Sequence, residues 1–237
     1  MEYEFSRTRR LLGQTAMERL KDSHVMVFGI GGVGSHCIEA LARSGVGRLS
    51  LVDHDVVSVS NINRQSIALQ STIGRHKTRV MKEKILDINP QARVRLYEEF
   101  ALPENVAGFF EERPDFVVDA IDTVSAKVAL AVFAKEQKIP IISCMGTGNK
   151  LNPSAFEIAD IYETSVCPLC RVMRRELKKR DVEGLTVLYS KEAPVSFAEE
   201  AKHGEDKNGR PVPGSVAFVP PAAGLMLAGY VIMKLCG

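Results

Sequence analysis

Four glycines between residues 29 and 34 form the first candidate site in the sequence. Gly29-Ile-Gly31-Gly32-Val-Gly34 fits the pattern G-x-G-x-x-G and directly follows a short apolar run. Glycine permits a tight turn there, and the first N–H groups of a following helix can bind phosphate. Asp53 lies 19 residues after Gly34, where a carboxylate can accept hydrogen bonds from ribose hydroxyls. The pattern therefore predicts a nucleotide-binding site.

Basic and acidic side chains beyond the glycines decide which nucleotide we expect. Arg64 and Lys77 come after the second apolar run, and Asp122 follows the fourth. Hydride transfer has no use for cations gathered around phosphates, whereas nucleotidyl transfer needs them, and a carboxylate can also hold Mg²⁺. We therefore expect ATP and Mg²⁺ rather than NAD. The segments that carry these residues are Asp53-His-Asp55, Ser60-Asn61-Ile-Asn63-Arg64-Gln65, Lys77 and Asp119-Ala-Ile-Asp122-Thr123.

The elements that must position these residues follow from hydrophobic periodicity. Short apolar runs predict strands at 24–29, 48–53, 93–98, 115–119, 139–144, 155–162 and 186–189. Helical spacing, helix-ending glycine and proline, and charge pattern predict helices at 9–20, 32–44, 77–88, 103–111, 125–137 and 169–180. This alternation predicts an α/β fold with a doubly wound, mostly parallel, Rossmann-like sheet and a C-terminal extension of strands and helices. Ligands of such sheets bind beyond the carboxyl ends of the strands.

The chain of 237 residues is expected to form a single ATP-binding domain. Residues 1–150 would form its nucleotide-binding core and 151–237 its C-terminal part. Residues 191–215 are polar, rich in Glu, Lys, Gly and Pro, and without a clear period. Such a composition predicts a mobile loop.

Composition predicts a soluble protein of the cytoplasm. The formal charge of +2 argues neither for nor against a nucleic-acid partner, and five cysteines, an odd number, do not suggest a disulfide framework. The N-terminus has no apolar run of signal-peptide length. Residues 216–233 carry no charge, but Pro220-Pro221 interrupts them. About a dozen apolar residues after the prolines are too few to span a membrane, so we expect a buried core helix and no membrane span.

Taken together and in order, the segments from Gly29 to Asp122 resemble the ubiquitin-activating-enzyme superfamily, which includes bacterial adenylyltransferases. The resemblance covers roughly residues 5–150. It implies that Gly32 contacts phosphate, that Asp53 binds ribose, and that Asp122 holds Mg²⁺. It also implies a homodimer in which an N-terminal arginine, Arg7 or else Arg10, reaches the neighbouring subunit. Catalysis would rest on Arg64, Lys77, Asp122 and Arg7. The expected ATP-binding residues are Gly29, Gly31, Gly32, Gly34, Asp53, Asp55, Asn61, Asn63, Arg64, Gln65, Lys77, Asp122 and Thr123.

The cysteines help to separate the branches of this superfamily. Its sulfur-carrier-activating members typically hold a structural zinc with two C-x-x-C pairs, and only Cys167-Pro-Leu-Cys170 is present here. Tetrahedral structural zinc needs four ligands. Cys236 and a histidine such as His203 would complete a site only by an unusual arrangement, so we do not expect zinc. A redox role for Cys167 and Cys170 stays open, and Cys144 near the site is expected to be a packed small residue.

The downstream half resembles the tRNA threonylcarbamoyladenosine dehydratase branch. The matching segments are Gly146-x-Gly148-Asn149-Lys150-x-x-Pro153, Thr164-Ser-Val-Cys-Pro-Leu169, Tyr189-Ser190-x-Glu192 and Pro213-Gly214-Ser215. The resemblance implies a threonylcarbamoyladenosine in tRNA as the substrate. ATP would activate the threonyl carboxylate, most simply as an adenylate with a phosphate ester left open, and ring closure would then release water. The basic helix would offer tRNA phosphates Arg171, Arg174, Arg175, Lys178, Lys179 and Arg180.

Three other functions stay open at this point. One is adenylation of the C-terminal glycine of a sulfur-carrier protein, which predicts zinc and a carrier-dependent exchange of pyrophosphate. Another is a nucleotide-binding scaffold without turnover, partnered with a sulfur-transfer protein such as a cysteine desulfurase. The third is an NAD-dependent redox enzyme, which would be indifferent to Arg64→Ala.

Overall fold

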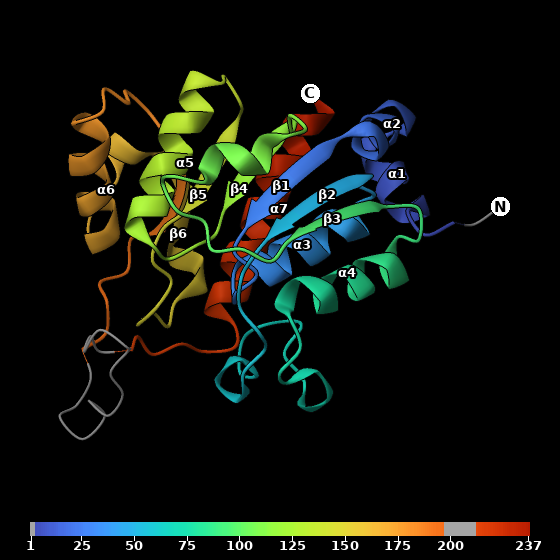
Figure 1. Cartoon of the computed structure of the whole chain (residues 1–237), viewed down its shortest axis with the longest axis horizontal. Coiled ribbons are helices and arrows are strands. Elements are labelled where there is room, and N and C mark those ends of the chain that lie inside the picture. Colours follow the sequence, from blue (N-terminus) through green and yellow to red (C-terminus); the bar gives the residue numbers. More distant parts are fainter. Residues whose placement is uncertain (1–2, 197–211) are drawn as a thin grey trace.

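The computed structural model describes residues 3–196 and 212–237, and a seven-stranded sheet runs through them (Figure 1). The strand order is β3-β2-β1-β4-β5-β7-β6, with β6 antiparallel to β7 and the other neighbours parallel. The predicted doubly wound, mostly parallel sheet is therefore confirmed. The strands are β1 His24–Phe28, β2 Arg48–Val52, β3 Arg93–Tyr97, β4 Phe116–Asp119, β5 Ile141–Cys144, β6 Phe156–Asp160 and β7 Thr186–Ser190.

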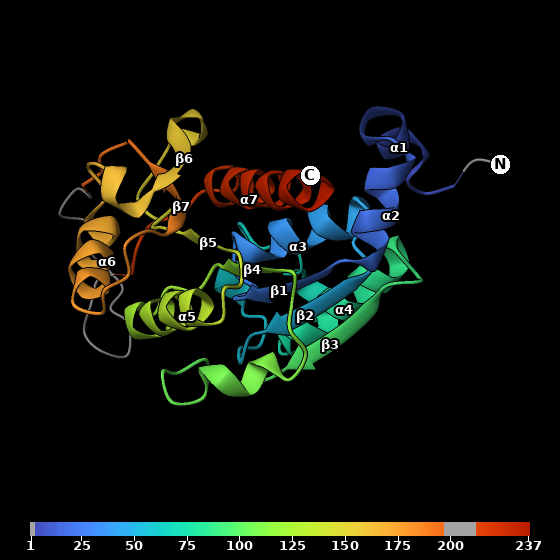
Figure 2. The ribbon, with the colours of Figure 1, turned by 90° about the horizontal axis from the view of Figure 1, so that it is seen from above.

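Helices cover both faces of the sheet because its inner strands are apolar on both sides. Val25 and Val27 pack with residues of α3, α4 and α7 on one face, whereas Met26 and Phe28 pack with α5 and η3 on the other. α6 lies against α5 at the β7 end (Figure 2). The helices are α1 Ser6–Leu12, α2 Gln14–Asp22, α3 Gly34–Arg43, α4 Lys77–Ile88, α5 Val124–Glu136, α6 Pro168–Lys178 and α7 Val219–Cys236, with the short 3₁₀ helix η3 at Val106–Phe110.

Two predicted helices differ from the structure for local reasons. The helix expected at 9–20 is divided into α1 and α2 at Gly13. Gly13 has a φ of +84°, a non-helical conformation that glycine adopts readily. The helix expected at 103–111 is only the 3₁₀ turn η3. There the Asn105 side chain accepts from the N–H of Leu102 at 2.8 Å and donates to the carbonyl of Phe100 at 2.9 Å. Such local bonds compete with helix formation.

The C-terminal helix α7 begins at the proline pair instead of after it. Pro220 and Pro221 occupy its first turn, where a missing N–H costs nothing, so the helix runs for 18 residues rather than a dozen. By length and composition alone α7 is a candidate membrane span. In this fold one face of it packs against α3, where a Cβ on Gly224 would lie 2.3 Å from the carbonyl oxygen of Val33 (Figure 2). The prediction of a core helix therefore holds for that face.

Glycines fix the turn from β1 into α3. Gly29 directly follows β1 with a φ of +89°. A Cβ on Gly34 would lie 1.8 Å from the carbonyl oxygen of Gly29, which no side chain tolerates. Because the chain doubles back this tightly, the first turn of α3 begins directly beyond the end of β1.

Candidate nucleotide-binding active site

A cavity of about 490 Å³ opens beyond the carboxyl ends of β1, β2, β4 and β5. It includes the point between β1 and β4 where the strand order reverses, which is where open α/β sheets bind ligands. Its volume lies within the roughly 300–1,000 Å³ of small-molecule sites. The predicted residues that line it are Gly29, Gly31, Gly32, Asp53, Asp55, Asn61, Arg64, Gln65, Lys77, Asp122 and Thr123.

Three of the predicted site residues do not line this cavity. Gly34 is buried beneath the glycine turn. Its missing side chain leaves room for the carbonyl group of Gly29 rather than for a ligand. Asn63 stands at the rim, donating to the carbonyl of Ser215 at 3.0 Å and accepting from Arg64 at 2.8 Å. Arg7 is exposed on α1, beside α2 at the far end of the strands, so it does not reach the cavity of its own chain (Figure 1).

The glycine loop forms one wall of the cavity. A Cβ on Gly31 would meet only the amide nitrogen of Gln65, at 4.0 Å, so the backbone there is open to a ligand. A Cβ on Gly32 would press against Pro220 and Arg64 at 3.0 and 3.2 Å. The buried Oε1 atom of Gln65 has no hydrogen-bond partner among the described residues. A bare backbone at a helix N-terminus and an unsatisfied buried amide both suit a bound nucleotide.

Asp53 joins the loops that follow β1 and β2. Its Oδ2 accepts from the N–H of Ile30 at 2.6 Å, and its Oδ1 accepts from the N–H of Asp55 at 2.8 Å. An ionised carboxylate has about four acceptor positions, so two remain for ribose hydroxyls. The contact with Ile30 also holds the glycine loop in place.

Charged side chains gather on the opposite wall. Lys77 is buried except for 5% of its surface, and its Nζ lies 2.7 Å from Oδ2 of Asp55. Asp53, His54 and Asp55 each offer one ligand atom, and these atoms lie within 4.8 Å of one another, close enough to share a cation. Asp122 is exposed, and within the described residues its carboxylate makes one long contact, 3.5 Å, to the hydroxyl of Thr123. The carboxylates therefore offer two places for a metal ion, of which the sequence suggested only Asp122.

A buried ion pair supports the floor of the cavity. Lys127 and Asp119 are both fully buried, with Nζ 2.9 Å from Oδ2, and Ser143 donates to the same carboxylate. Lys127 also donates to the carbonyls of Ile121 at 3.1 Å and Cys144 at 2.8 Å. This one ammonium thus ties together the loops that leave β4 and β5. Sequence reasoning missed Lys127, because it lies among the apolar residues of a helix and offers no motif.

The C-terminal part closes the remaining side of the cavity. Gly146, Gly148, Pro213 and Gly214 line it, and the sequence did not assign them to the site. The glycines after β5 were the available signal, because bare backbone beyond a parallel strand commonly faces a ligand. Asn149 holds this wall together, accepting from the N–H of Gly214 at 2.6 Å and donating its own N–H to the carbonyl there at 2.8 Å.

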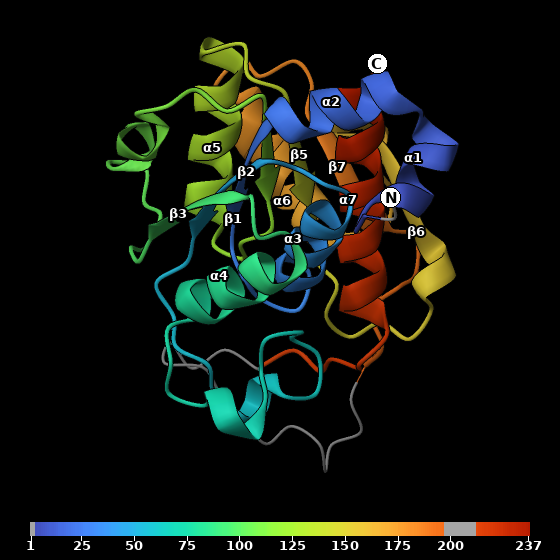
Figure 3. The ribbon, with the colours of Figure 1, turned by 90° about the vertical axis from the view of Figure 1, so that its right-hand side faces the viewer.

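The predicted mobile loop at 191–215 is tied down at both of its described ends. Val195 donates its N–H to the carbonyl of Asn149 at 2.8 Å, and Asn63 from the loop after β2 reaches Ser215. Figure 3 shows the segment before α7 running beside that loop. Residues 197–211, and with them His203, lie outside the described residues.

Cys144 lines the cavity but is nearly covered. Burial raises the pKa of its thiol to about 12. The side chain packs as the small apolar residue that we expected, and it offers no thiolate to a substrate.

The basic helix α6 is less available to an anion than its sequence suggests. Arg174 is half-buried and donates to the carbonyl and the hydroxyl of Thr164, so it is less free to contact tRNA than the other basic residues of the helix. Three other basic side chains are exposed but share the carboxylate of Glu176: Lys179 and Arg180, which follow α6, and Arg175 within it. Together they lower the pKa of Glu176 to about 2. Arg171 and Lys178 are exposed and have no ion pair with a described residue. These two are the strongest remaining candidates for phosphate contacts.

Replacing Arg174 by alanine should lower the free energy of unfolding by about 1–3 kcal/mol, because a buried carbonyl loses its donor. Arg171→Ala on the same helix is the matched control and should stay within about 0.5 kcal/mol of the wild type. Urea denaturation measures both. An equal effect of the two substitutions would contradict the structural role of Arg174.

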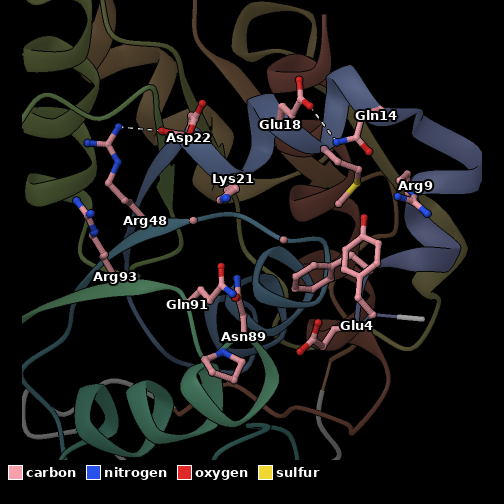
Figure 4. Close-up of a pocket in the computed structure, with 16 residues that line it drawn as sticks. Glu4, Arg9, Gln14, Glu18, Lys21, Asp22, Arg48, Asn89, Gln91 and Arg93 are labelled. Carbon is pink, nitrogen blue, oxygen red and sulfur yellow. Dashed lines mark hydrogen bonds between the residues drawn. The ribbon is translucent and has the colours of Figure 1, made fainter. Parts of the chain in front are cut away.

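A second, larger cavity of about 970 Å³ lies at the amino ends of β2 and β3 (Figure 4). It is lined by Arg48 and Arg93 on neighbouring strands, by Lys21, and by Glu18, which accepts from Gln14. None of the predicted site residues lines it, and the glycine loop is at the other end of the sheet. The smaller cavity is therefore the candidate active site.

Known proteins resemble this chain over nearly its whole length. The description "ThiF family" matches residues 5–237. The tRNA threonylcarbamoyladenosine dehydratase of Bacillus subtilis strain 168 is 43% identical over 99% of this chain and 95% of its own length. The enzyme of that name from Escherichia coli K12 is 41% identical over 73% of this chain and 65% of its own.

Solved structures agree with the sequence relatives. The crystal structure of the Escherichia coli dehydratase in complex with ATP superposes with a TM-score of 0.88 and 34% identity, covering 98% of this chain and 93% of that one. The expected membership of the adenylyltransferase-like superfamily is thereby confirmed. With a family match across 5–237 and relatives of this identity, the chain belongs to the ThiF family.

Proposed function

We propose that this protein uses ATP to dehydrate threonylcarbamoyladenosine in tRNA to its cyclised form. The observation that carries the proposal is the cavity itself, which brings together Gly31, Arg64 and Asp122 from three loops and Lys77 from the start of α4. That set suits a nucleotide with its phosphates engaged. The dehydratase relatives from two bacteria, which cover most of this chain, support the choice of tRNA over a carrier protein.

Each side chain then has a part in activating the threonyl carboxylate. Backbone N–H groups at the start of α3 and Gly32 receive phosphate, and Asp53 receives the ribose hydroxyls. Arg64 and Lys77 stabilise the charge that builds on the phosphates as the carboxylate attacks. Asp122 would hold Mg²⁺, which would offset the negative charge of the phosphates. An atom of the substrate's own modified side chain then attacks the activated acyl group and closes the ring. No nucleophile from the protein is therefore needed.

The assembly that we propose is a cytoplasmic homodimer. Arg7 is exposed and distant from the cavity of its own chain, so it serves catalysis only if it reaches the cavity of the partner subunit. All five cysteines are free thiols, as expected in a reducing compartment.

Arg171 and Lys178 would contact tRNA phosphates, with Arg175 and Lys179 beside them.

The function is tested by incubating the protein with ATP, Mg²⁺ and tRNA that carries the modification. The tRNA is then digested to nucleosides, which are weighed by mass spectrometry. Loss of one water from threonylcarbamoyladenosine is the expected result, with no loss when ATP is omitted or replaced by AMP. Unchanged nucleosides, together with pyrophosphate exchange that depends on a sulfur-carrier protein, would establish the alternative adenylyltransferase function instead.

A further inference from the structure

His36 on α3 holds the backbone of a residue whose side chain lines the nucleotide cavity. Its Nε2 atom lies 3.1 Å from the carbonyl oxygen of Arg64. A carbonyl oxygen has no proton to give, so Nε2 carries the proton and donates this hydrogen bond. The described residues that line the cavity include Arg64 but not His36. Any effect of the histidine on a bound nucleotide is therefore transmitted through Arg64.

Two more side-chain contacts fix the residues that follow Arg64. The hydroxyl oxygen of Ser35, also on α3, accepts from the N–H of Ser66 at 3.1 Å. Lys84 of α4 donates to the carbonyl of Ser66 at 3.1 Å. Gln65, which lines the cavity, lies between these anchored residues. The backbone on both sides of Gln65 is thus bound to the two helices.

The position of His36 is set by close packing between α3 and α7. A Cβ on Gly224 of α7 would lie 3.0 Å from the Cβ of His36, and the two helices lie side by side (Figure 2). The histidine is half-buried there. Its ring therefore extends from a helix packed into the fold, and groups that rest on helices are held more precisely than groups that rest on loops.

The side chain of Arg64 packs against the glycine loop. A Cβ on Gly32 would lie 3.2 Å from the Cγ atom of Arg64. Beyond that carbon, the guanidinium donates to the carbonyl of Ser60 at 2.9 Å and to the side-chain oxygen of Asn63 at 2.8 Å. Because Ser60 and Asn63 belong to the same loop as Arg64, these two bonds move with that loop. The bond from His36 instead links the loop to α3, the helix that directly follows the glycines.

We propose that His36 is a positioning residue for the nucleotide: its hydrogen bond to the Arg64 carbonyl holds the Arg64 guanidinium in a fixed place relative to the glycine loop, where the phosphates of ATP would lie. The inference rests on the proposed binding of ATP. A long side chain and its loop lose conformational freedom when they bind a ligand, and an anchored backbone has less freedom to lose. Without the bond, ATP must also order the loop, so its affinity falls.

The contact from His36 acts as a neutral hydrogen bond. Burial lowers the pKa of His36 from its ordinary value, so the ring is uncharged at pH 7. A glutamine at this position is also neutral, and its amide N–H reaches about as far from the backbone as Nε2 does. A leucine resembles glutamine in size but has no donor. The pair of variants His36→Gln and His36→Leu therefore separates the donor from the volume of the side chain.

The experiment titrates ATP with Mg²⁺ into the full-length protein without tRNA, up to millimolar ATP, and measures the Kd by calorimetry. We expect His36→Leu to raise the Kd about threefold to tenfold, the scale of one lost hydrogen bond, and His36→Gln to stay within about twofold of the wild type. In the Arg64→Ala background, His36→Leu should have no further effect, because the guanidinium that it positions is absent. An unchanged Kd, or an equal loss in both backgrounds, would overturn the proposal.

His24 supplies the matched control for a purely structural effect. It begins β1, at the opposite end of that strand from the glycine loop, and its Nε2 lies 2.8 Å from the hydroxyl oxygen of Ser50. His24→Leu should make the protein less stable to urea but leave the Kd of ATP within about twofold of the wild type. If His24→Leu weakens ATP binding as much as His36→Leu does, general loss of stability explains both effects, and the positioning role is refuted.

Assays of tRNA dehydration by the same variants separate this inference from the proposed function. A protein whose ATP affinity depends on His36 and Arg64, but which leaves the tRNA unchanged, would refute the proposed function alone. Dehydration of tRNA with the same KM for ATP in the wild type and in His36→Leu would refute the positioning role alone.

Discussion

Replacing Asp122 by alanine should reduce turnover about 100-fold or more, the scale on which a lost electrostatic contact to a reacting group acts. The carboxylate borders the cavity, is exposed, and has only a 3.5 Å contact to Thr123 among the described residues. Its charge is therefore available to a metal ion rather than committed to the fold. For the same reason the free energy of unfolding should change by less than about 0.5 kcal/mol.

The measurement is the initial rate of tRNA dehydration over a range of Mg²⁺ concentrations. Glu99→Gln is the matched control, because Glu99 is another exposed carboxylate that lines the cavity. We expect that control to retain its rate within about threefold. If Asp122→Ala keeps full activity and an unchanged dependence on Mg²⁺, the ion is not held by Asp122.

The strands and the glycine loop could be predicted because their causes are local. The central strands β1 and β4 are short, mostly apolar runs, and Gly29 has a φ of +89°, which favours glycine. Parallel strands then bring their carboxyl ends together, so residues far apart in sequence, such as Arg64 and Asp122, line one cavity. For this part of the site, a residue that directly follows a parallel strand in the sequence also lies at the cavity in the fold.

The rest of the site could not be predicted because it depends on tertiary contacts. Arg174 looks like its basic neighbours in the sequence, and only the fold places it against Thr164 rather than in solvent. Gly214 enters the cavity wall through bonds to Asn149, which is 65 residues away. The hydrophobic periodicity of these segments does not predict either hydrogen-bonded contact.

The buried pair of Lys127 and Asp119 is the strongest case of this kind, and its removal should have the largest effect on stability. Lys127→Met leaves a fully buried carboxylate without its cation, which costs about 3–5 kcal/mol. Lys135→Met, on the exposed part of the same helix, should cost less than about 1 kcal/mol. Chemical denaturation of both variants gives the comparison.

A double substitution separates the charge from the packing. Asp119→Asn together with Lys127→Met removes both charges, so it should destabilise the protein by less than the sum of the two single substitutions. Strict additivity would mean that the two side chains do not interact. Residual activity discriminates further, since Lys127 holds the carbonyls of Ile121 and Cys144 at the floor of the cavity. The double variant, even where folded, should therefore show a raised KM for ATP, because without that ammonium the two loops are no longer fixed to each other.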